Sequence, residues 1–330
     1  MTTMRALLLN SYEDGTLTDT QITRPVPGVG EVLVRVVASG VNPVDLSIRK
    51  GTAPYAMPEL PAVLGCDMAG VVADVGEGVS AFKVGDEVYG MTGGVRGLQG
   101  SLAEYQVVDA DFLAIKPSKL SMRQAAAIPL VFLTAWEGLV DAAAVQPGQT
   151  VLVQGGAGGV GHMAVQIARA RGARVFATAS EGKRDLVETL GATFINYNTE
   201  KVADFVARHT GGVGFDVVYD TVGGSVLDQS MLAIKPHGHI VSCCAFGQYT
   251  LAPGSFRCMT LSGVFVILPM LSGKQRSHQG AILAEATRMV DADALMPILD
   301  PRTFDLSQAM AAHAVQASGK LVGKLVIDVR

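Results

Sequence analysis

The chain has 330 residues, of which 49% are hydrophobic and 17% are charged, and its formal net charge is −4. This length exceeds one ordinary core and predicts about two domains in a protein that buries much of its chain. The slightly acidic balance offers no basic footprint for a phosphate backbone, so we expect no nucleic-acid partner.

The beginning of the chain and its cysteines both favour a cytoplasmic location. Only one short apolar run, Ala6–Leu9, precedes the first acidic residues, a pattern unlike a secretory signal. The four cysteines, at positions 66, 243, 244 and 258, form neither a disulfide framework nor a CxxC pair. We therefore expect a protein of a reducing compartment.

One segment, Ala125–Val145, is apolar over the length of a membrane span. It is interrupted by Pro129 and by two acidic residues, Glu137 and Asp141. It also follows the capping-box pattern Ser121–Gln124, which marks a helix start. We expect buried helices here and no membrane partner.

The first 120 residues alternate short strand patterns with turn clusters. The expected strands cover residues 4–10, 18–23, 31–39, 69–75, 87–89 and 104–108. Glycine-containing clusters such as Gly76–Gly78 and Val84–Asp86 separate them. This part predicts an irregular, mostly antiparallel β domain.

From Gln149 onward, strand patterns alternate with helical patterns. The expected strands cover residues 150–154, 174–178, 193–196, 215–220, 237–243 and 261–267. Such alternation predicts an α/β fold with a doubly wound parallel sheet. A helix at 280–290 and a strand within 321–329 are expected to return to the first domain. We place the β domain at residues 1–123 and 268–330, and the parallel domain at 124–267.

The stretch Val151–Gly161 reads as a strand, a tight turn and the start of a helix. Gly156, Gly158 and Gly161 have the spacing of a dinucleotide fingerprint. We expect the first to permit the turn, the second to let the backbone approach a pyrophosphate, and the third to let the helix pack on the strand. The phosphates would bind N–H groups at the helix N-terminus.

The residues after the second strand of this domain predict NADPH as the cofactor. An NAD site has an acidic residue about 20 positions beyond the glycines, whereas this chain has Ala179 and Ser180 there. Ser180 can donate a hydrogen bond to a 2′-phosphate, and Lys183 or Arg184 can supply positive charge. The alternative is that Lys183 and Arg184 only begin a solvated helix.

Several motifs together carry a family resemblance over nearly the whole chain. They are Ala38–Asp45, Leu64–Val72, Val84–Val88, Leu133–Trp136, the glycine motif and Asp220–Gly224. In this order they resemble the medium-chain dehydrogenase/reductase superfamily, and within it the zinc-independent quinone oxidoreductase branch that includes zeta-crystallin. The resemblance implies a GroES-like catalytic domain interrupted in sequence by a Rossmann dinucleotide-binding domain.

Zinc-dependent members of this superfamily differ from the chain at their metal ligands. They have a cysteine where this chain has Asn42, and Gly-His-Glu where it has Gly65, Cys66 and Asp67. They also have a lobe with four cysteines, whereas residues 91–102 here contain none. Because catalytic zinc takes about three protein ligands, we expect no metal site.

The resemblance also suggests which residues act. It places Asn42 beside the nicotinamide, where its amide could donate to the acceptor oxygen or orient the cofactor ribose. Asn42 could equally be a turn-forming residue before Pro43. Tyr55 could donate a proton or line the pocket, and Thr134 matches a cofactor-contacting position. Further cofactor contacts are expected from Ala157, Gly159, Val160, Tyr197, Val222 and Lys324.

These features predict a zinc-independent, NADPH-dependent reductase that transfers hydride to quinones or α,β-unsaturated carbonyls. In such acceptors the developing charge spreads into an enolate or quinol anion, which a few hydrogen-bond donors can stabilise. The alternatives are a reductase of enoyl thioesters or other activated alkenes, and a non-catalytic NADPH-binding protein. The apolar run Leu261–Leu268 reads as an edge strand that could pair across a two-fold axis, so we also expect a homodimer.

Overall fold

The structure, a computed structural model that describes residues 2–330, divides into two compact units. The first comprises the described residues up to Leu130 together with Ile267–Arg330, and the second comprises Val131–Val266. The units correspond to a GroES-like antiparallel domain and a Rossmann domain, as expected. Residues 124–130 belong to the first unit, in which α2 (Met122–Ala126) packs against four strands of the larger sheet.

The first unit contains two sheets. The smaller has the strand order β2-β1-β4, and the larger has the order β15-β16-β3-β5-β6-β8, with β7 also paired to β3. The strands are β1 (Thr3–Leu9), β2 (Leu17–Thr23), β3 (Glu31–Val41), β4 (Ala62–Val63), β5 (Asp67–Val75), β6 (Glu87–Met91), β7 (Tyr105–Asp109), β8 (Leu113–Ile115), β15 (Phe304–Asp305) and β16 (Leu325–Asp328). β16 pairs antiparallel to β3, so the tail returns to this unit as expected.

The first unit also contains several helices. They are α1 (Pro43–Arg49), α2, α9 (Leu268–Ser272), α10 (Arg276–Asp291) and α11 (Ala309–Ser318), with short 3₁₀ turns η1 (Ala110–Phe112) and η4 (Leu306–Gln308). The capping box at Ser121 and Gln124 begins α2, as the sequence predicts. A Cβ atom at Gly40 of β3 would lie 2.2 Å from the Ala126 carbonyl oxygen. Gly40 therefore allows α2 to approach the sheet closely.

The apolar segment that starts at Ala125 forms buried helices. It contains the end of α2, then α3 (Pro129–Trp136), then the π-helical turn η2 (Glu137–Ala142). Most of its residues are buried within protein. Across the described residues, no helix is both long enough and apolar enough to cross a bilayer.

The second unit is a doubly wound parallel sheet with the order β11-β10-β9-β12-β13-β14. Its strands are β9 (Thr150–Gln154), β10 (Arg174–Ala179), β11 (Thr193–Asn196), β12 (Phe215–Asp220), β13 (Ile234–Ser242) and β14 (Thr260–Gly263). All neighbours pair parallel. Val151, Leu152 and Val153 of the central strand are fully buried, as expected for a strand covered on both faces.

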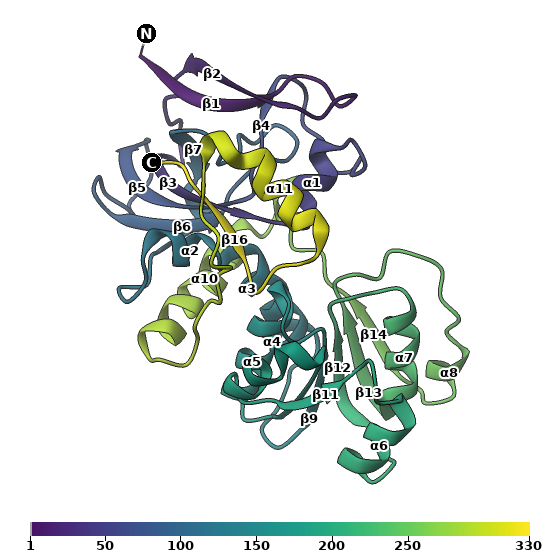
Figure 1. The fold of residues 1–330 in the computed structure, drawn as a ribbon. Coiled ribbons are helices and arrows are strands. Elements are labelled where there is room, and N and C mark those ends of the chain that lie inside the picture. Colours follow the sequence, from purple (N-terminus) through teal and green to yellow (C-terminus); the bar gives the residue numbers. More distant parts are fainter. Residues whose placement is uncertain (1) are drawn as a thin grey trace. The chain divides into compact units, whose positions relative to one another are not determined.

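Helices cover both faces of this sheet. α4 (Gly159–Ala170) and α5 (Arg184–Thr189) lie on one face, and α6 (Val202–Thr210) and α7 (Ser225–Ala233) lie on the other (Figure 1). Short elements η3 (Glu181–Lys183) and α8 (Ala252–Ser255) complete the unit. Phe176 and Phe215 meet edge-on at 5.2 Å beneath α6 and α7, in a core whose side chains each contribute about 1.5–3 kcal/mol by burial.

The last strand of the parallel sheet is shorter than the sequence predicts. The apolar run suggested a strand over 261–267, but β14 ends at Gly263, which is paired with Ser242. Ser242 is the last residue of β13, so β14 has no partner strand beyond this point. Val264, Val266 and Ile267 are buried outside the ladder, and α9 then begins at Leu268 with Pro269 in its first turn.

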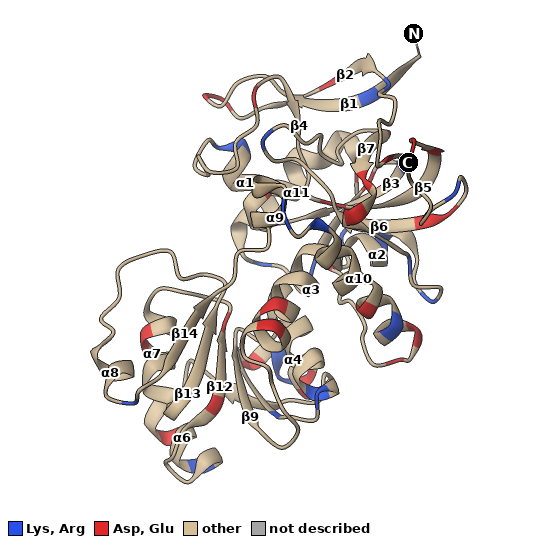
Figure 2. Cartoon of the chain, turned by 180° about the vertical axis from the view of Figure 1, so that it is seen from behind, with Lys and Arg blue, Asp and Glu red and all other residues tan. Residues whose placement is uncertain are grey.

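Charge is distributed without a dominant sign. Figure 2 shows basic and acidic residues interspersed on both units. This distribution agrees with the small net charge of the chain.

Candidate functional site

The strand order of the Rossmann unit reverses between β9 and β12. β10 and β11 continue the sheet on one side of β9, and β12 to β14 continue it on the other. Gln154 and Asp220 pair at the carboxyl ends of the two central strands, and the Thr221 hydroxyl donates to the Gln154 carbonyl at 2.6 Å. Ligands of open α/β sheets bind outside the carboxyl ends of the strands at this kind of position.

The glycine turn follows β9 at this position, and the structure corrects the role of its first fingerprint residue. Gly155 has the positive φ of +75° that the turn requires, so Gly156 does not have that role. A Cβ at Gly156 would lie 2.5 Å from the Ala177 Cβ of β10, so Gly156 is needed for packing. A Cβ at Gly161 would lie 2.0 Å from the Gly155 carbonyl oxygen, which agrees with close approach of the helix.

The N-terminus of α4 is suited to phosphate. Gly158 is the N-cap residue, and no side chain caps the helix. The N–H groups of the first turn, at Gly159, Val160 and Gly161, have no intrahelical acceptor, so they can bind an anion. Ala157 and Gly158 precede them, and the latter is exposed. The residues present therefore fit the pyrophosphate of a dinucleotide.

Other expected cofactor residues lie at the same edge of the sheet. Ser180 follows β10 and is the N-cap residue of η3, and Tyr197 follows β11 with 57% of its surface exposed. Val222 follows β12, and its N–H donates to the Asp220 carboxylate at 3.0 Å. A Cβ at Gly155 would meet Thr221 and Val222 at 2.9 Å, so this loop borders the glycine turn.

The two basic residues after Ser180 differ in their surroundings. Arg184 is paired with Glu181 at 2.7 Å and with Glu188 at 3.5 Å, and its guanidinium lies 4.2 Å from the centre of the Phe194 ring. Within the described chain, the Lys183 ammonium has no ion-pair or hydrogen-bond partner. Of the two, Lys183 is therefore the one with charge available for a ligand.

The prediction from the sequence did not consider the acidic residue that lies beside Ser180, after β10. Glu181 directly follows Ser180, close to where an NAD site has its acid. Its carboxylate accepts hydrogen bonds from Arg184 Nε at 2.7 Å and from Asn196 Nδ2 at 2.9 Å. The Arg184 hydrogen bond holds the pKa of Glu181 below its usual value, so the charge is present and compensated. The position of Glu181 in the sequence was the available signal.

Thr134 is held inside the Rossmann unit. Its side chain is almost fully buried, and its carbonyl oxygen accepts a hydrogen bond from the Tyr219 hydroxyl at 2.6 Å. Tyr219 belongs to β12 and is fully buried. The contact fixes α3 against the central part of the sheet.

In the first unit, Asn42 is a fully buried residue at the start of α1. Its Nδ2 donates to Asp67 Oδ2 at 2.9 Å, and its Oδ1 accepts from the Lys324 ammonium. Its backbone N–H donates to Asp45 at 2.8 Å, which helps to begin the helix. An amide Nδ2 has two hydrogens, so one donor remains beyond the bond to Asp67.

Lys324 is an ammonium enclosed by this cluster. Its Nζ donates to the Val41 carbonyl at 2.8 Å and to Asn42, and lies 3.9 Å from Asp67 Oδ2. Burial lowers the pKa of Lys324, and the Asp67 and Asp45 carboxyls oppose this shift. Burial raises the pKa of Asp67 to about 7, against the opposing effect of Lys324.

The cluster does not fit a zinc ion. Both Asp67 oxygens accept hydrogen bonds, from Asn42 and from the Leu130 N–H. Burial raises the pKa of the Cys66 thiol, whereas zinc binds a thiolate. Among residues 2–330, no group of three or more His, Cys, Asp or Glu side chains could hold a metal. The positive charge at this place belongs to Lys324, and metal-independent activity stays a prediction.

Tyr55 lies in the turn that follows α1, with 38% of its surface exposed. Its carbonyl oxygen accepts a hydrogen bond from Arg96 Nε at 2.8 Å. Within α1, the Ser47 hydroxyl donates to the Pro43 carbonyl at 3.2 Å. A role of the Tyr55 phenol in proton transfer stays a prediction.

We expect Lys324→Met to destabilise the protein by about 1–3 kcal/mol, because it leaves the buried Val41 and Asn42 oxygens without their donor and makes Asp67 take up a proton. Urea unfolding would measure the loss. Lys320→Met is the matched control, because Lys320 is exposed. Adding Asp67→Asn to Lys324→Met should recover part of the loss. Equal stability of the Lys324 and Lys320 variants would contradict this account of the cluster.

Two family models match the chain. One, described as alcohol dehydrogenase GroES-like domain, covers residues 28–118, and the other, described as zinc-binding dehydrogenase, covers residues 159–288. Among curated proteins, the NADPH-dependent alkenal/one oxidoreductase of Arabidopsis thaliana is 33% identical over 335 residues, which cover 98% of this chain and 79% of that protein.

Solved structures agree over the whole length. An alcohol dehydrogenase superfamily protein from Novosphingobium aromaticivorans is 50% identical with a TM-score of 0.96, and the match covers 99% of this chain and 100% of that one. The quinone oxidoreductase from Coxiella burnetii is 31% identical with a TM-score of 0.84, and the match covers both chains completely.

Proposed function

Because the chain belongs to the zinc-independent quinone oxidoreductase branch of the medium-chain dehydrogenase/reductase superfamily, we propose that it reduces quinones or α,β-unsaturated carbonyl compounds with NADPH. The observation that carries the proposal is the buried Lys324 ammonium against Asn42 and Asp67, where zinc-dependent members have metal ligands. A site with hydrogen-bond donors in place of a Lewis acid favours acceptors that delocalise charge.

Different residues bind the cofactor, contact the acceptor and supply the proton in the proposed reaction. The chemistry that bound NADPH would supply here is a hydride from the nicotinamide C4. The glycine turn Gly156–Gly161 binds the pyrophosphate at the N-terminus of α4, with Thr134 and Val222 as further cofactor neighbours. Asn42 donates its remaining N–H to the acceptor or ribose oxygen, and Lys324 polarises that amide through Oδ1. The proton comes from Tyr55 or from solvent.

Two other functions use parts of the same arrangement. A reductase of enoyl thioesters or other activated alkenes would need the same donors, because hydride addition again leaves an enolate. A non-catalytic NADPH-binding protein would need only the glycine turn and the residues around Ser180. A measurement of NADPH turnover would distinguish the non-catalytic binding protein from either reductase.

We expect the purified protein to oxidise NADPH in the presence of a simple quinone or enone, and a chelator to leave the rate unchanged. The reason is that delocalised anions need only hydrogen-bond donors, and the cluster provides no metal site. The loss of NADPH absorbance measures the rate. Stoichiometric zinc that is lost together with activity would contradict metal independence. Tight NADPH binding without turnover on quinones, enones and enoyl thioesters would favour the binding protein.

We propose NADPH as the preferred cofactor, with Ser180, Lys183 and Tyr197 around the 2′-phosphate. Lys183→Ala should raise the KM for NADPH by up to about tenfold and leave that for NADH almost unchanged, because only NADPH has the extra phosphate. Steady-state kinetics with both cofactors measures this. Lys201→Ala, at an exposed lysine of the same unit, is the control. An equal loss for both cofactors would refute the assignment.

We also propose a homodimer in the cytoplasm that pairs through β14. This strand is at the edge of the Rossmann sheet, and Leu261 within it is 39% exposed. Two such edges related by a two-fold axis would form one continuous sheet. Light scattering should give twice the mass of the chain. A monomer at micromolar concentration would count against the pairing.

A further inference from the structure

A pocket of about 490 Å³ lies between α1 and α11 in the first unit. It is lined by Pro43, Leu46 and Ser47 of α1, by Lys50 and Thr52 directly after this helix, and by Gln316 and Ala317 of α11. The first four of these residues have the spacing i, i+3, i+4, i+7, which places them along one face of the helix. The pocket therefore lies between one face of α1 and two residues near the end of α11.

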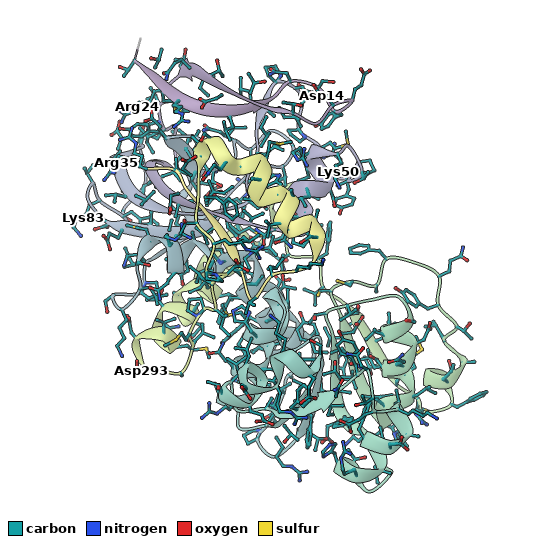
Figure 3. The ribbon with its side chains drawn as sticks, in the orientation of Figure 1. Asp14, Arg24, Arg35, Lys50, Lys83 and Asp293 are labelled. Atoms are coloured by element: carbon teal, nitrogen blue, oxygen red, sulfur yellow. The ribbon has the colours of Figure 1, made fainter. Side chains whose placement is uncertain are left out.

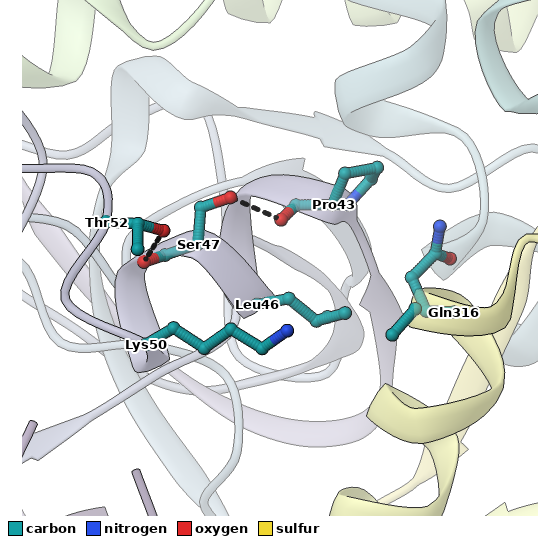
Figure 4. Close-up of a pocket in the computed structure, with 7 residues that line it drawn as sticks. Pro43, Leu46, Ser47, Lys50, Thr52 and Gln316 are labelled. Atoms are coloured by element: carbon teal, nitrogen blue, oxygen red, sulfur yellow. Dashed lines mark hydrogen bonds between the residues drawn. The ribbon is translucent and has the colours of Figure 1, made fainter. Parts of the chain in front are cut away.

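The pocket offers hydrogen-bond donors from two side chains. The Ser47 hydroxyl uses its hydrogen for the Pro43 carbonyl, and Thr52 uses its hydrogen for the Ser47 carbonyl (Figure 4). The Lys50 ammonium and the Gln316 amide have no hydrogen-bond partner among the described residues. Figure 4 shows Lys50 and Leu46 extending toward the side on which Gln316 lies. A ligand here meets a cation and an amide above an apolar floor.

The charge of the pocket is positive. Lys50 projects from the end of α1 (Figure 3), and no Asp or Glu lines the pocket. His313 lies one turn before Gln316 and Ala317 on α11, but burial and the Arg49 guanidinium lower its pKa to about 4, so it is neutral at pH 7. In an acidic chain, one unpaired ammonium without carboxylates favours an anionic ligand.

One residue that lines the pocket is the sequence neighbour of Asn42, which the proposed function assigns to the reacting end of the substrate. Pro43, which lines it, directly follows Asn42. Along α1, the backbone rises roughly 12 Å between Asn42 and Lys50 at 1.5 Å per residue. A chain of that order of length, with its enone at Asn42, would bring a group at its far end to Lys50.

We propose that this pocket binds an anionic group, carboxylate or phosphate, at the far end of the acceptor. The substrate class is then an acidic enone with an apolar chain of several carbons. Lys50 and Gln316 bind the anion, and Leu46, Pro43 and Ala317 contact the chain. This inference rests on the proposed reductase function and adds the acceptor's charge to it.

The test compares a straight-chain methyl enone that has a terminal carboxylate with its methyl ester, and with the corresponding terminal phosphate. The native enzyme should have a lower KM for at least one charged acceptor than for the ester. Lys50→Met should raise that KM about tenfold and change the KM for the ester less than about twofold, as expected for loss of one charge-assisted contact. Lys50→Arg should retain most of the preference. The better charged acceptor identifies the anion.

Lys274→Met is the matched control, because Lys274 is an exposed lysine of the same unit that does not line the pocket. It should behave like the native enzyme. Equal KM values for ester and both charged acceptors in the native enzyme, or equal effects of Lys50→Met on all three, would overturn the proposal.

Binding of the saturated keto acid and keto phosphate separates this proposal from the proposed function. Titration calorimetry should show that the native protein binds at least one of them about tenfold more tightly than Lys50→Met does. Binding without any turnover of the enones would reject the reductase and retain the anion site. Equal affinities of the native and Lys50→Met proteins would reject the anion site even if the ester is reduced.

Discussion

The buried contact between Lys324 and the Asn42–Asp67 pair is the constraint on which the catalytic unit depends. It joins β16, near the end of the chain, to the β3–α1 junction and to the start of β5. A buried ammonium is costly unless its hydrogens are accepted, so these elements must meet in one geometry. The same requirement orients the Asn42 amide, whose Nδ2 has one hydrogen beyond the bond to Asp67.

The Rossmann unit depends on a different constraint, which is close backbone approach. Gly156 and Gly161 have no room for a Cβ, because β10 and the Gly155 carbonyl are already in contact range. This packing places the open N-terminus of α4 at the reversal of strand order. In the proposed function, the N–H groups of this turn bind phosphate and the Asn42 amide of the other unit is a hydrogen-bond donor, which is suited to hydride transfer without a Lewis acid.

The proposed anion pocket makes a second use of α1. One face of this short helix has Asp45 buried against the Asn42 cluster, and another has Leu46, Ser47 and Lys50 in the pocket. Because both faces belong to one short helix, a substrate could be bound at both ends without a conformational change in the protein. Selectivity for the acceptor would then come from helix geometry and one charge.

The sequence by itself determined the strand and helix order, the glycine turn and the family, because these depend on local periodicity and on motifs with fixed spacing. Tertiary structure decided what depends on partners distant in the chain. β14 ends at Gly263 because its partner strand β13 ends at Ser242. Arg184 forms ion pairs with Glu181 and Glu188, whereas Lys183 forms none within the described residues. Lys324 was predicted only as a cofactor contact. Its place as the counter-ion of Asp67 arises because β16 pairs with β3, a pairing between segments almost a whole chain apart that no local pattern specifies.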